Sequence, residues 1–330
     1  MDAFKKILIV PVFFLIIFTS LISLMSGCND NNITDNSSMT DDEYISTIAI
    51  NTAFSGNSDD DDNLFSSEVF DFDSDGPVSD DPGSDTPIDS VLKWGRRILD
   101  VNVNTEITNV GDSIKNVLVT RTVTGNFIII GYINGILDST IKPFTQQQRR
   151  IINFKRTNRH HHPRHNWRVY EYSAIDGNTT TPQTGKDNII INKVEFYKNN
   201  ELVLTLNGPD FTTNFFRAGF FGGHNMNEAD AGESFKMMVY LTSNQSETDA
   251  VSYHWPRNSN GHQRVRFDLV SEIPNGNGFD RVFEKTIEIF HQHRHGRHNA
   301  FISANTNSSL FDNDPNLLSS TYMGFPYRVR

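Results

Sequence analysis

The sequence predicts a mainly β protein, in which one or two antiparallel β-sandwich modules follow a disordered acidic tether. Three observations lead to this fold class. Residues 28–90 hold 17 Asp and Glu, no Lys or Arg and few large apolar side chains, so this stretch cannot bury enough surface to fold. Later segments alternate apolar and polar residues or are rich in β-branched and aromatic residues, as strands are. Gly, Asn and Asp separate these segments at short intervals, which is typical of the turns of a sandwich.

The N-terminal residues have the pattern of an export signal. Two lysines precede an apolar run at residues 7–25, and two small residues then lead to Cys28, the single cysteine of the chain. A cysteine in this place resembles the lipobox of bacterial lipoproteins. The resemblance implies cleavage before Cys28, attachment of fatty acids such as palmitate to this residue, and a place in the bacterial cell envelope, on the periplasmic face or the cell surface. An uncleaved membrane anchor is the alternative, because about 19 apolar residues can span a bilayer.

Composition divides the chain into four parts: a signal peptide at 1–27, the acidic tether at 28–88, a β-rich module at 89–180 and a second module at 185–330. A run of turn-forming residues at 176–188 sets the boundary between the modules. The hairpin at 191–206 and the small-residue turn at 231–233 are similar to those of immunoglobulin-like sandwiches. The resemblance implies that fold for the second module. The first module is either a second sandwich or a curved sheet with one helix.

Candidate strands run through both modules. Residues 89–99 are the one segment whose periodicity fits a short helix. Residues 117–122 and 126–133 are predicted strands on either side of a turn that contains Gly125, and residues 198–200 are the predicted turn of a hairpin. The other predicted strands are 150–155, 167–172, 188–197, 201–206, 234–241, 264–269, 283–290, 300–304 and 322–329.

Residues 71–79 of the tether resemble the first nine positions of an EF-hand calcium loop. Asp71, Asp73 and Asp75 alternate before a glycine, and alternate carboxylates suit a cation that takes six to eight oxygen ligands. The twelfth position, where a Glu completes an EF-hand site, is Pro82. An acidic linker is therefore the main expectation, and a calcium site at the three aspartates is the alternative.

Eight of the 11 histidines fall in two clusters that share a short pattern around a Pro or a Gly. This pattern predicts that both clusters are the tips of hairpins. Alternate histidines of a strand project from one face, where their imidazoles can share a zinc, copper or nickel ion. A metal-binding protein of the periplasm or cell surface is therefore one interpretation. Its candidate ligands are His160, His162, His165, His291, His293, His295 and His298.

The same tips are basic, which favours an anionic partner. Residues 139–170 hold eight Lys and Arg and no acidic residue. Arginine forms charge-assisted bonds with phosphate, sulfate and uronate groups, and the neighbouring Trp167 and Tyr170 could stack on sugar rings. Nucleic acid is not the expected partner of an exported protein, although the charge would allow it. The candidate anion-binding residues are Arg156, Arg159, Arg164, Arg168, Arg294 and Arg297.

Motifs of the common catalytic classes are missing from the sequence. The glycine-rich residues 219–225 lack the Lys-Ser/Thr ending of a phosphate-binding loop, and there is no Gly-x-Ser-x-Gly or His-Glu-x-x-His. The carboxylate pair of a hydrolase leaves no local signature, so a hydrolase is kept as a second alternative. The main prediction is a lipoprotein held in the membrane by its lipid anchor, with a binding or structural role, whose His/Arg tips contact anionic polysaccharide, phosphate groups or another envelope component.

Overall fold

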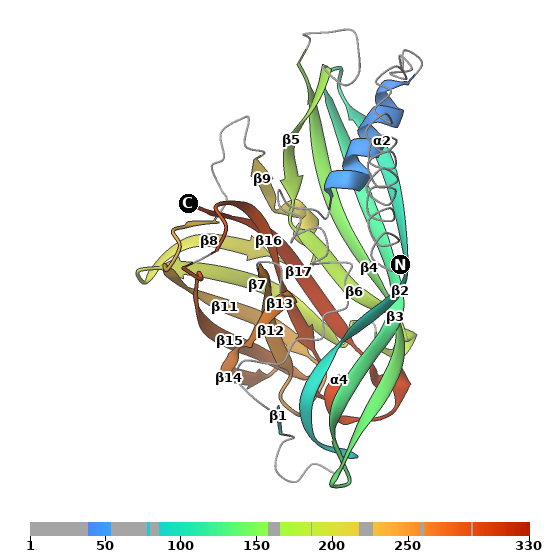
Figure 1. The fold of residues 1–330 in the computed structure, drawn as a ribbon, viewed down its shortest axis with the longest axis vertical. Helices are drawn as coiled ribbons and strands as arrows, with labels where there is room; N and C mark the ends of the chain where they lie inside the picture. The colour runs from blue at the N-terminus through green and yellow to red at the C-terminus, as the bar shows by residue number, and fades with distance from the viewer. Residues whose placement is uncertain are drawn as a thin grey trace, which may run out of the picture. The chain divides into compact units, whose positions relative to one another are not determined.

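The body of the protein is mainly β, and its sheets are antiparallel, as the sequence predicts (Figure 1). From Asp41 onward the chain forms one compact unit. Among the residues that the structure describes, no helix combines the length and the apolar content needed to cross a membrane. The computed structural model describes residues 39–53, 78–79, 86–157, 166–185, 187–217, 227–257, 261–291 and 293–330.

A sheet of twelve strands, the large sheet, runs through the body. Three of its strands are much longer than the usual ten residues or fewer: β2 (Ile88–Val110), β3 (Ile114–Ile133) and β4 (Ile136–Arg156). Asn134 and Gly135 join the last two with positive φ at both residues, as a two-residue hairpin turn requires. The other strands are β1 (Val78–Ser79), β5 (Trp167–Ser173), β6 (Ile175–Thr181), β9 (Phe215–Arg217), β10 (Asn227–Ala229), β12 (Ala250–Arg257), β13 (Gly261–Arg266), β16 (Gly296–Asn305) and β17 (Ser320–Val329).

The order of strands shows that early and late segments of the chain share the large sheet. This order is β1-β2-β3-β4-β6-β17-β16-β12-β13, with β5, β9 and β10 paired off the main path. β6 is antiparallel to both β4 and β17. The sequence predicts an interruption at 176–188, but its first half is this strand, because Ile175, Gly177 and Thr179 alternate at buried positions. The predicted modules 89–180 and 185–330 therefore both contribute strands to one sheet.

A second sheet of five strands, the small sheet, consists of β7 (Ile189–Lys198), β8 (Glu201–Asn207), β11 (Ser234–Ser243), β14 (Asp268–Pro274) and β15 (Phe279–Glu288). Its order is β14-β15-β11-β7-β8. Phe196 of β7 lies 4.9 Å from Phe325 of β17, and Phe235 of β11 lies 6.4 Å from Tyr253 of β12, between ring centroids. The small sheet thus packs on β12 and β17 of the large sheet around an aromatic core, as in a β-sandwich.

The hairpin predicted around residues 198–200 is confirmed. β7 and β8 pair antiparallel, and Asn199 and Asn200 take the positive φ angles that asparagine tolerates in such a turn. The strand predicted at 264–269 is divided between the sheets. Arg266 ends β13 in the large sheet, Asp268 begins β14 in the small sheet, and the buried Phe267 lies at the corner between them.

The helix predicted at 89–99 is wrong, because these residues belong to β2. Ile88, Val91 and Trp94 are buried at a spacing of three residues, which resembles helical periodicity. The cause is a series of β-bulges in the pairing of β2 with β3, near residues 89, 92 and 99. Each bulge adds one residue to β2, so the buried positions no longer repeat every second residue.

The turn predicted at Gly125 is also wrong, because β3 continues through it as one strand. The two strands predicted at 117–122 and 126–133 are parts of this strand. A Cβ atom at Gly125 would lie 2.3 Å from the carbonyl oxygen of Arg97 on β2. Glycine is therefore needed for the close approach of two backbones, as it is at other sites inside strands.

Two parts of the predicted tether belong to the body. One is β1, and the other is α2 (Asp41–Thr52), which lies along β2 and β3 in Figure 1. Ile45, Ala49 and Ala53 of this segment are fully buried. Asp42 forms an ion pair with Lys115, and the carbonyl oxygen of Ala53 accepts a hydrogen bond of 2.5 Å from Arg150. The remaining helical segments are η1 (Gln183–Gly185), η2 (Phe211–Thr213), α4 (Asn307–Phe311) and η4 (Pro315–Leu317).

The core consists of two hydrophobic clusters, and β4 contributes to both. Its inward-facing Phe144 belongs to the smaller cluster, and Ile152 and Phe154 belong to the larger one. The inward-facing positions between them are Gln146, Gln148 and Arg150, all buried. A polar and cationic stretch therefore separates two apolar regions on the same face of the large sheet.

Candidate functional site

The first histidine cluster falls in residues 158–165, which connect β4 to β5. These strands pair antiparallel, with Arg156 opposite Trp167. Several predictions concern residues outside the described part of the chain. They are the calcium site, the lipidation site, and part of both the metal-binding and the anion-binding predictions. These residues are Cys28, Asp71, Asp73, Asp75, Arg159, His160, His162, Arg164 and His165.

The second histidine cluster lies where the chain crosses between the two sheets. β15 of the small sheet ends at Glu288, and β16 of the large sheet begins at Gly296. The predicted hairpin tip is therefore wrong, and so is the strand with His291, His293 and His295 on one face. His291 and His295 are exposed, whereas His293 and His298 are buried, because a connection between packed sheets has no regular alternation.

The two buried histidines have their Nε2 atoms in hydrogen bonds within the chain. Their rings lie 4.4 Å apart between centroids. His293 Nε2 is 2.7 Å from the hydroxyl of Tyr327, and His298 Nε2 is 2.7 Å from the carbonyl oxygen of Arg294. In the described part of the chain, His, Cys, Asp and Glu nowhere gather in a group of three that could hold a metal ion. Of the seven predicted metal ligands, the four described ones thus comprise two exposed imidazoles and two buried, hydrogen-bonded imidazoles.

Cations and tyrosines gather along β5. Lys155 and Arg217 lie 5.4 and 6.0 Å from the ring of Tyr170. Arg150 and Arg297 lie 4.5 and 5.4 Å from the ring of Tyr172. The pairing of β5 with β4 is irregular at Tyr170, so Arg168 and Tyr172 lie on opposite faces of the sheet. Arg168 pairs with the exposed Lys155, whereas the buried Tyr172 pairs with the buried Ile152. We call the exposed side of this region the β5 surface, and its residues are Lys155, Arg156, Arg168, Tyr170 and Arg217, with the carboxylate of Glu171 opposite Arg217.

The two faces of β5 bring together residues from both predicted tips. Arg156 and Arg168 flank the first tip and are exposed. Arg297 comes from the second cluster and donates a hydrogen bond of 3.2 Å from Nη1 to the hydroxyl of Tyr172. Arg294 is exposed. Three of the predicted anion-binding arginines therefore lie on or beside one strand, and Arg217 of β9 joins them through the pairing of β9 with β5.

Buried cations lie behind β5, on the inner face of the large sheet. Arg150 is 2 % exposed, and burial lowers its pKa to about 10, with a smaller effect of the charge on Arg297. Burial also lowers the pKa of Arg121 to about 10, and the charge on Arg96 adds to this effect. Both shifts mean that the surroundings disfavour the positive charge. An anion placed among these groups would offset that penalty.

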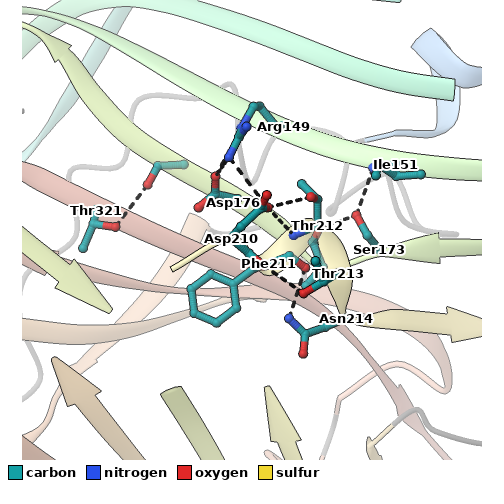
Figure 2. A network of polar contacts seen from close by, with 12 residues as sticks. Arg149, Ile151, Ser173, Asp176, Asp210, Phe211, Thr212, Thr213, Asn214 and Thr321 are labelled. Atoms are coloured by element: carbon teal, nitrogen blue, oxygen red, sulfur yellow. Dashed lines mark hydrogen bonds and ion pairs between the residues drawn. The ribbon is translucent and has the colours of Figure 1, made fainter. Parts of the chain in front are cut away.

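A separate polar network joins β4, β6 and the residues before η2 (Figure 2). Arg149 Nη2 lies 2.5 Å from Asp176 Oδ2 and 3.6 Å from Asp210 Oδ1. Burial raises the pKa of Asp176, although the bonds from Arg149 oppose this. Asp210 also accepts hydrogen bonds from the backbone NH and the hydroxyl of Thr212. The arginine thus holds both carboxylates in place, which does not resemble the open carboxylate pair of a hydrolase.

Beside this network lies a cavity of about 190 Å³. Asp176, Asp187 and Asp210 line it together with Arg149. The described lining residues thus carry three carboxylates and one guanidinium, and their net charge is negative. It is therefore unsuited to the anionic partner that the sequence predicts, and the β5 surface is the better match.

Sequence reasoning missed Arg217 and the buried Arg96, Arg121 and Arg264. For Arg121 a signal was present. Val117, Val119 and Val123 are buried at alternate positions of β3, and Arg121 occupies the position of the same series between them. A charged residue in register with buried apolar positions indicates a buried charge. No protein-family model matches this chain, and no curated protein is similar to it at a significant level.

Proposed function

We propose that the chain is an exported protein, held in the bacterial cell envelope by lipid on Cys28, and that its body binds the anionic groups of an envelope glycan or phosphate polymer. The observation that supports this proposal is the β5 surface. On this surface Tyr170 lies within about 6 Å of Lys155 and Arg217, and the exposed Arg156 and Arg168 belong to the same pair of strands, β4 and β5.

The arrangement along β5 suits a polymer with repeated charges. Lys155 pairs with Arg168 across β4 and β5, and Arg217 of β9 contacts the same Tyr170 ring as Lys155, so cations from three neighbouring strands surround one partly exposed aromatic side chain. Arginine and lysine bind phosphate, sulfate and carboxylate with charge-assisted hydrogen bonds. The exposed Arg156 and Arg168 form no ion pair with another described residue, so their charges are available to a partner.

The test of anion binding uses the mature lipoprotein in mild detergent. We expect retention on immobilised polygalacturonate, heparin or polyphosphate, and a loss of retention as salt screens the charges. The variant Arg156→Gln/Arg168→Gln/Arg217→Gln should weaken retention about tenfold or more. Its control is Lys198→Gln/Lys236→Gln/Lys285→Gln, which removes the same charge from lysines paired with Glu233, Glu284 and Asp268. No retention, or equal losses in both triple variants, would overturn the proposal.

The lipid anchor needs its own test. We expect labelled palmitate to be incorporated into the wild-type protein and not into Cys28→Ser. This variant should also keep its signal peptide, because cleavage before the cysteine follows lipid attachment in the lipoproteins that the sequence resembles. A wild-type protein that stays in the membrane without label would instead indicate an uncleaved apolar anchor.

A further inference from the structure

A small pocket lies where two distant parts of the large sheet come together. β2 and β13 stand near opposite ends of the strand order, yet Arg264 of β13 donates a hydrogen bond of 3.0 Å from Nη1 to the carbonyl oxygen of Trp94 on β2. The guanidinium of Arg264 also lies 3.6 Å from the centre of the Trp94 ring. The sheet therefore curves until its ends meet, and the pocket lies between them.

The pocket is lined by residues of β2, β3, β12, β13, β16 and β17, and its volume is about 20 Å³. Such a space holds little more than one small polar group, since a single water needs about 10–15 Å³ by the same measure. None of these described lining residues is acidic. They are Trp94, Gly95, Arg96, Phe127, His254, Arg264, Phe301, Ser303, Asn305 and Tyr322.

Arg96 is held rigidly beside this space. It is 4 % exposed, and its Nη1 donates a hydrogen bond of 3.0 Å to Gln146, which in turn donates one of 2.6 Å to the hydroxyl of Tyr322. The guanidinium lies 5.0 Å from the Tyr322 ring. Its second terminal nitrogen, Nη2, is buried and has no hydrogen-bond partner among the described residues. A buried donor without a partner is costly, and a native site normally supplies an acceptor.

The neighbours of Arg96 add positive charge and further polar atoms. Arg264 also lines the pocket, and Arg121 lies close enough for its charge to oppose that of Arg96. His254 lies on the other side, where its Nε2 is 2.8 Å from the hydroxyl of Ser303 and its ring stacks on Phe301 at 4.2 Å. Guanidinium groups stay charged at all physiological pH values, so this charge cannot be relieved by loss of a proton.

We propose that this pocket binds the terminal oxyanion of a small ligand: a carboxylate, sulfate or phosphate group. Nη2 of Arg96 offers its N–H donors to such a group, and the guanidinium of Arg264 adds a second fixed positive charge beside it. The aromatic walls exclude water, so each bond to the anion is stronger than it would be at the surface. The size of the pocket limits entry to the end of a ligand, and the rest of that ligand lies outside it.

This site does not depend on the β5 surface and is tested separately. The full mature protein in mild detergent is titrated with sodium acetate, sulfate or phosphate, and binding is followed as thermal stabilisation. At least one of the three should give a saturable curve. Sodium chloride at equal ionic strength is the reference, because the general effect of salts grows without saturating.

Substitutions of Arg96 then test whether the anion binds at this residue. Arg96→Gln should weaken it at least tenfold, and Arg96→Lys, which keeps the charge but loses the fork, should weaken it less. Arg97→Gln is the matched control, because this exposed neighbour lies on the opposite side of β2. Since a buried arginine can be needed for folding, tryptophan emission of the wild-type protein gives a second measurement. Trp94 lines the pocket, so its emission should change with the same dissociation constant.

Three results would overturn the proposal. The first is no saturable stabilisation with any of the three anions, and the second is equal binding by the wild-type protein and a folded Arg96→Gln variant. The third concerns the acidic segment of the chain itself, which is another source of carboxylates. If anions bind only after Asp59, Asp60, Asp61 and Asp62 are changed to Asn, the occupant is this segment and not a separate ligand. Retention on polyanion resins, which tests the β5 surface, should be the same in Arg96→Gln as in the wild-type protein.

Discussion

The large and the small sheet both bury arginine, but among the described residues only the small sheet has buried carboxylates beside its cations. Arg281 of β15 is 1 % exposed, and its Nη1 lies 2.5 Å from the buried Asp249. Its Nε lies 2.6 Å from Glu272, and its Nη2 donates to the carbonyl oxygens of Gln245 and Ser246. The described strands of the large sheet bury five cations, whereas the carboxylate of Asp176, beside Arg149, is only partly buried. The five cations are Arg96, Arg121, Lys142, Arg150 and Arg264.

This difference separates two uses of a buried charge. A buried arginine whose donors are matched by carboxylates and carbonyls inside the protein stabilises one arrangement of the chain and has nothing left to offer a ligand. A buried arginine held by neutral groups keeps a positive field, which is costly unless an anion arrives. The small sheet therefore has the features of a scaffold, and the large sheet has those of a binding element.

The largest expected effect is the loss of the arginine at the centre of the small sheet. Arg281→Met leaves Asp249 buried without its counter-charge, and we expect the free energy of unfolding to fall by about 3–5 kcal/mol in urea titrations. The double variant Arg281→Met/Asp249→Leu should recover most of this loss, because no fully buried charge is left unpaired and Glu272 is a third exposed to water. A loss below about 1 kcal/mol for the single variant would contradict the view that this charge is matched within the protein.

Removing the charge of Lys142 in the large sheet should raise the free energy of unfolding at pH 7, whereas removing that of Arg281 lowers it. Burial lowers its pKa from 10.5 to about 8, although the carboxylates of Asp312 and Asp314 oppose the shift. Between these pH values the folded protein binds fewer protons than the unfolded chain. The free energy of unfolding therefore rises as the pH goes from 8 to 10.5, and this gain is lost again as the pH falls back to 8. The difference corresponds to about 3 kcal/mol.

Lys142→Met tests this directly by urea unfolding at pH 7, 8, 9 and 10. The variant should be more stable than the wild-type protein at pH 7, by up to about 3 kcal/mol, and this advantage should shrink as the pH rises. The comparison between variant and wild type removes the contribution of other groups that titrate in this range. Parallel pH profiles would show that the charge on Lys142 is not penalised in the fold.

Replacing Arg150 should lower the free energy of unfolding less than replacing Arg281 does, and the change should be confined to the surroundings of Arg150. Its guanidinium donates hydrogen bonds of 2.7 and 2.5 Å to the carbonyl oxygens of Ser173 and Ala53, and Ala53 follows the last residue of α2. We expect Arg150→Met to cost about 1–3 kcal/mol, because two carbonyls lose a charged donor. Amide hydrogen exchange should become faster in α2 and stay unchanged in the small sheet. Equal acceleration in both regions would contradict a local role.

These contrasts also explain what the sequence could predict. The β7–β8 hairpin depends on its own turn residues, Asn199 and Asn200, and local residues are what sequence patterns report. The course of β2 depends on bulges set by its pairing with β3, which no local pattern contains.

The residues of the candidate site also divide into those that local sequence patterns predict and those that depend on long-range contacts. Arg156 and Arg168 were predicted from the charge of their own segment. The contact of Arg297 with Tyr172 joins residues 125 positions apart, and the contact of Arg264 with Trp94 joins residues 170 positions apart. Only the curvature of the large sheet brings these pairs together, so sequence patterns cannot report them.

The smallest expected effect comes from an exposed charge on the same pair of strands as Arg281. Lys236 of β11 lies 3.2 Å from Glu284 of β15, and about a third of each side chain is exposed. Water and salt screen such a pair, so Lys236→Gln should change the free energy of unfolding by no more than about 0.5 kcal/mol, and 1 M NaCl should remove the difference. Arg281 and Lys236 then differ in burial and not in the sheet that carries them. If Lys236→Gln proved as costly as Arg281→Met, burial would not be what gives a charge its effect here, and the contrast between the two sheets would lose its physical basis.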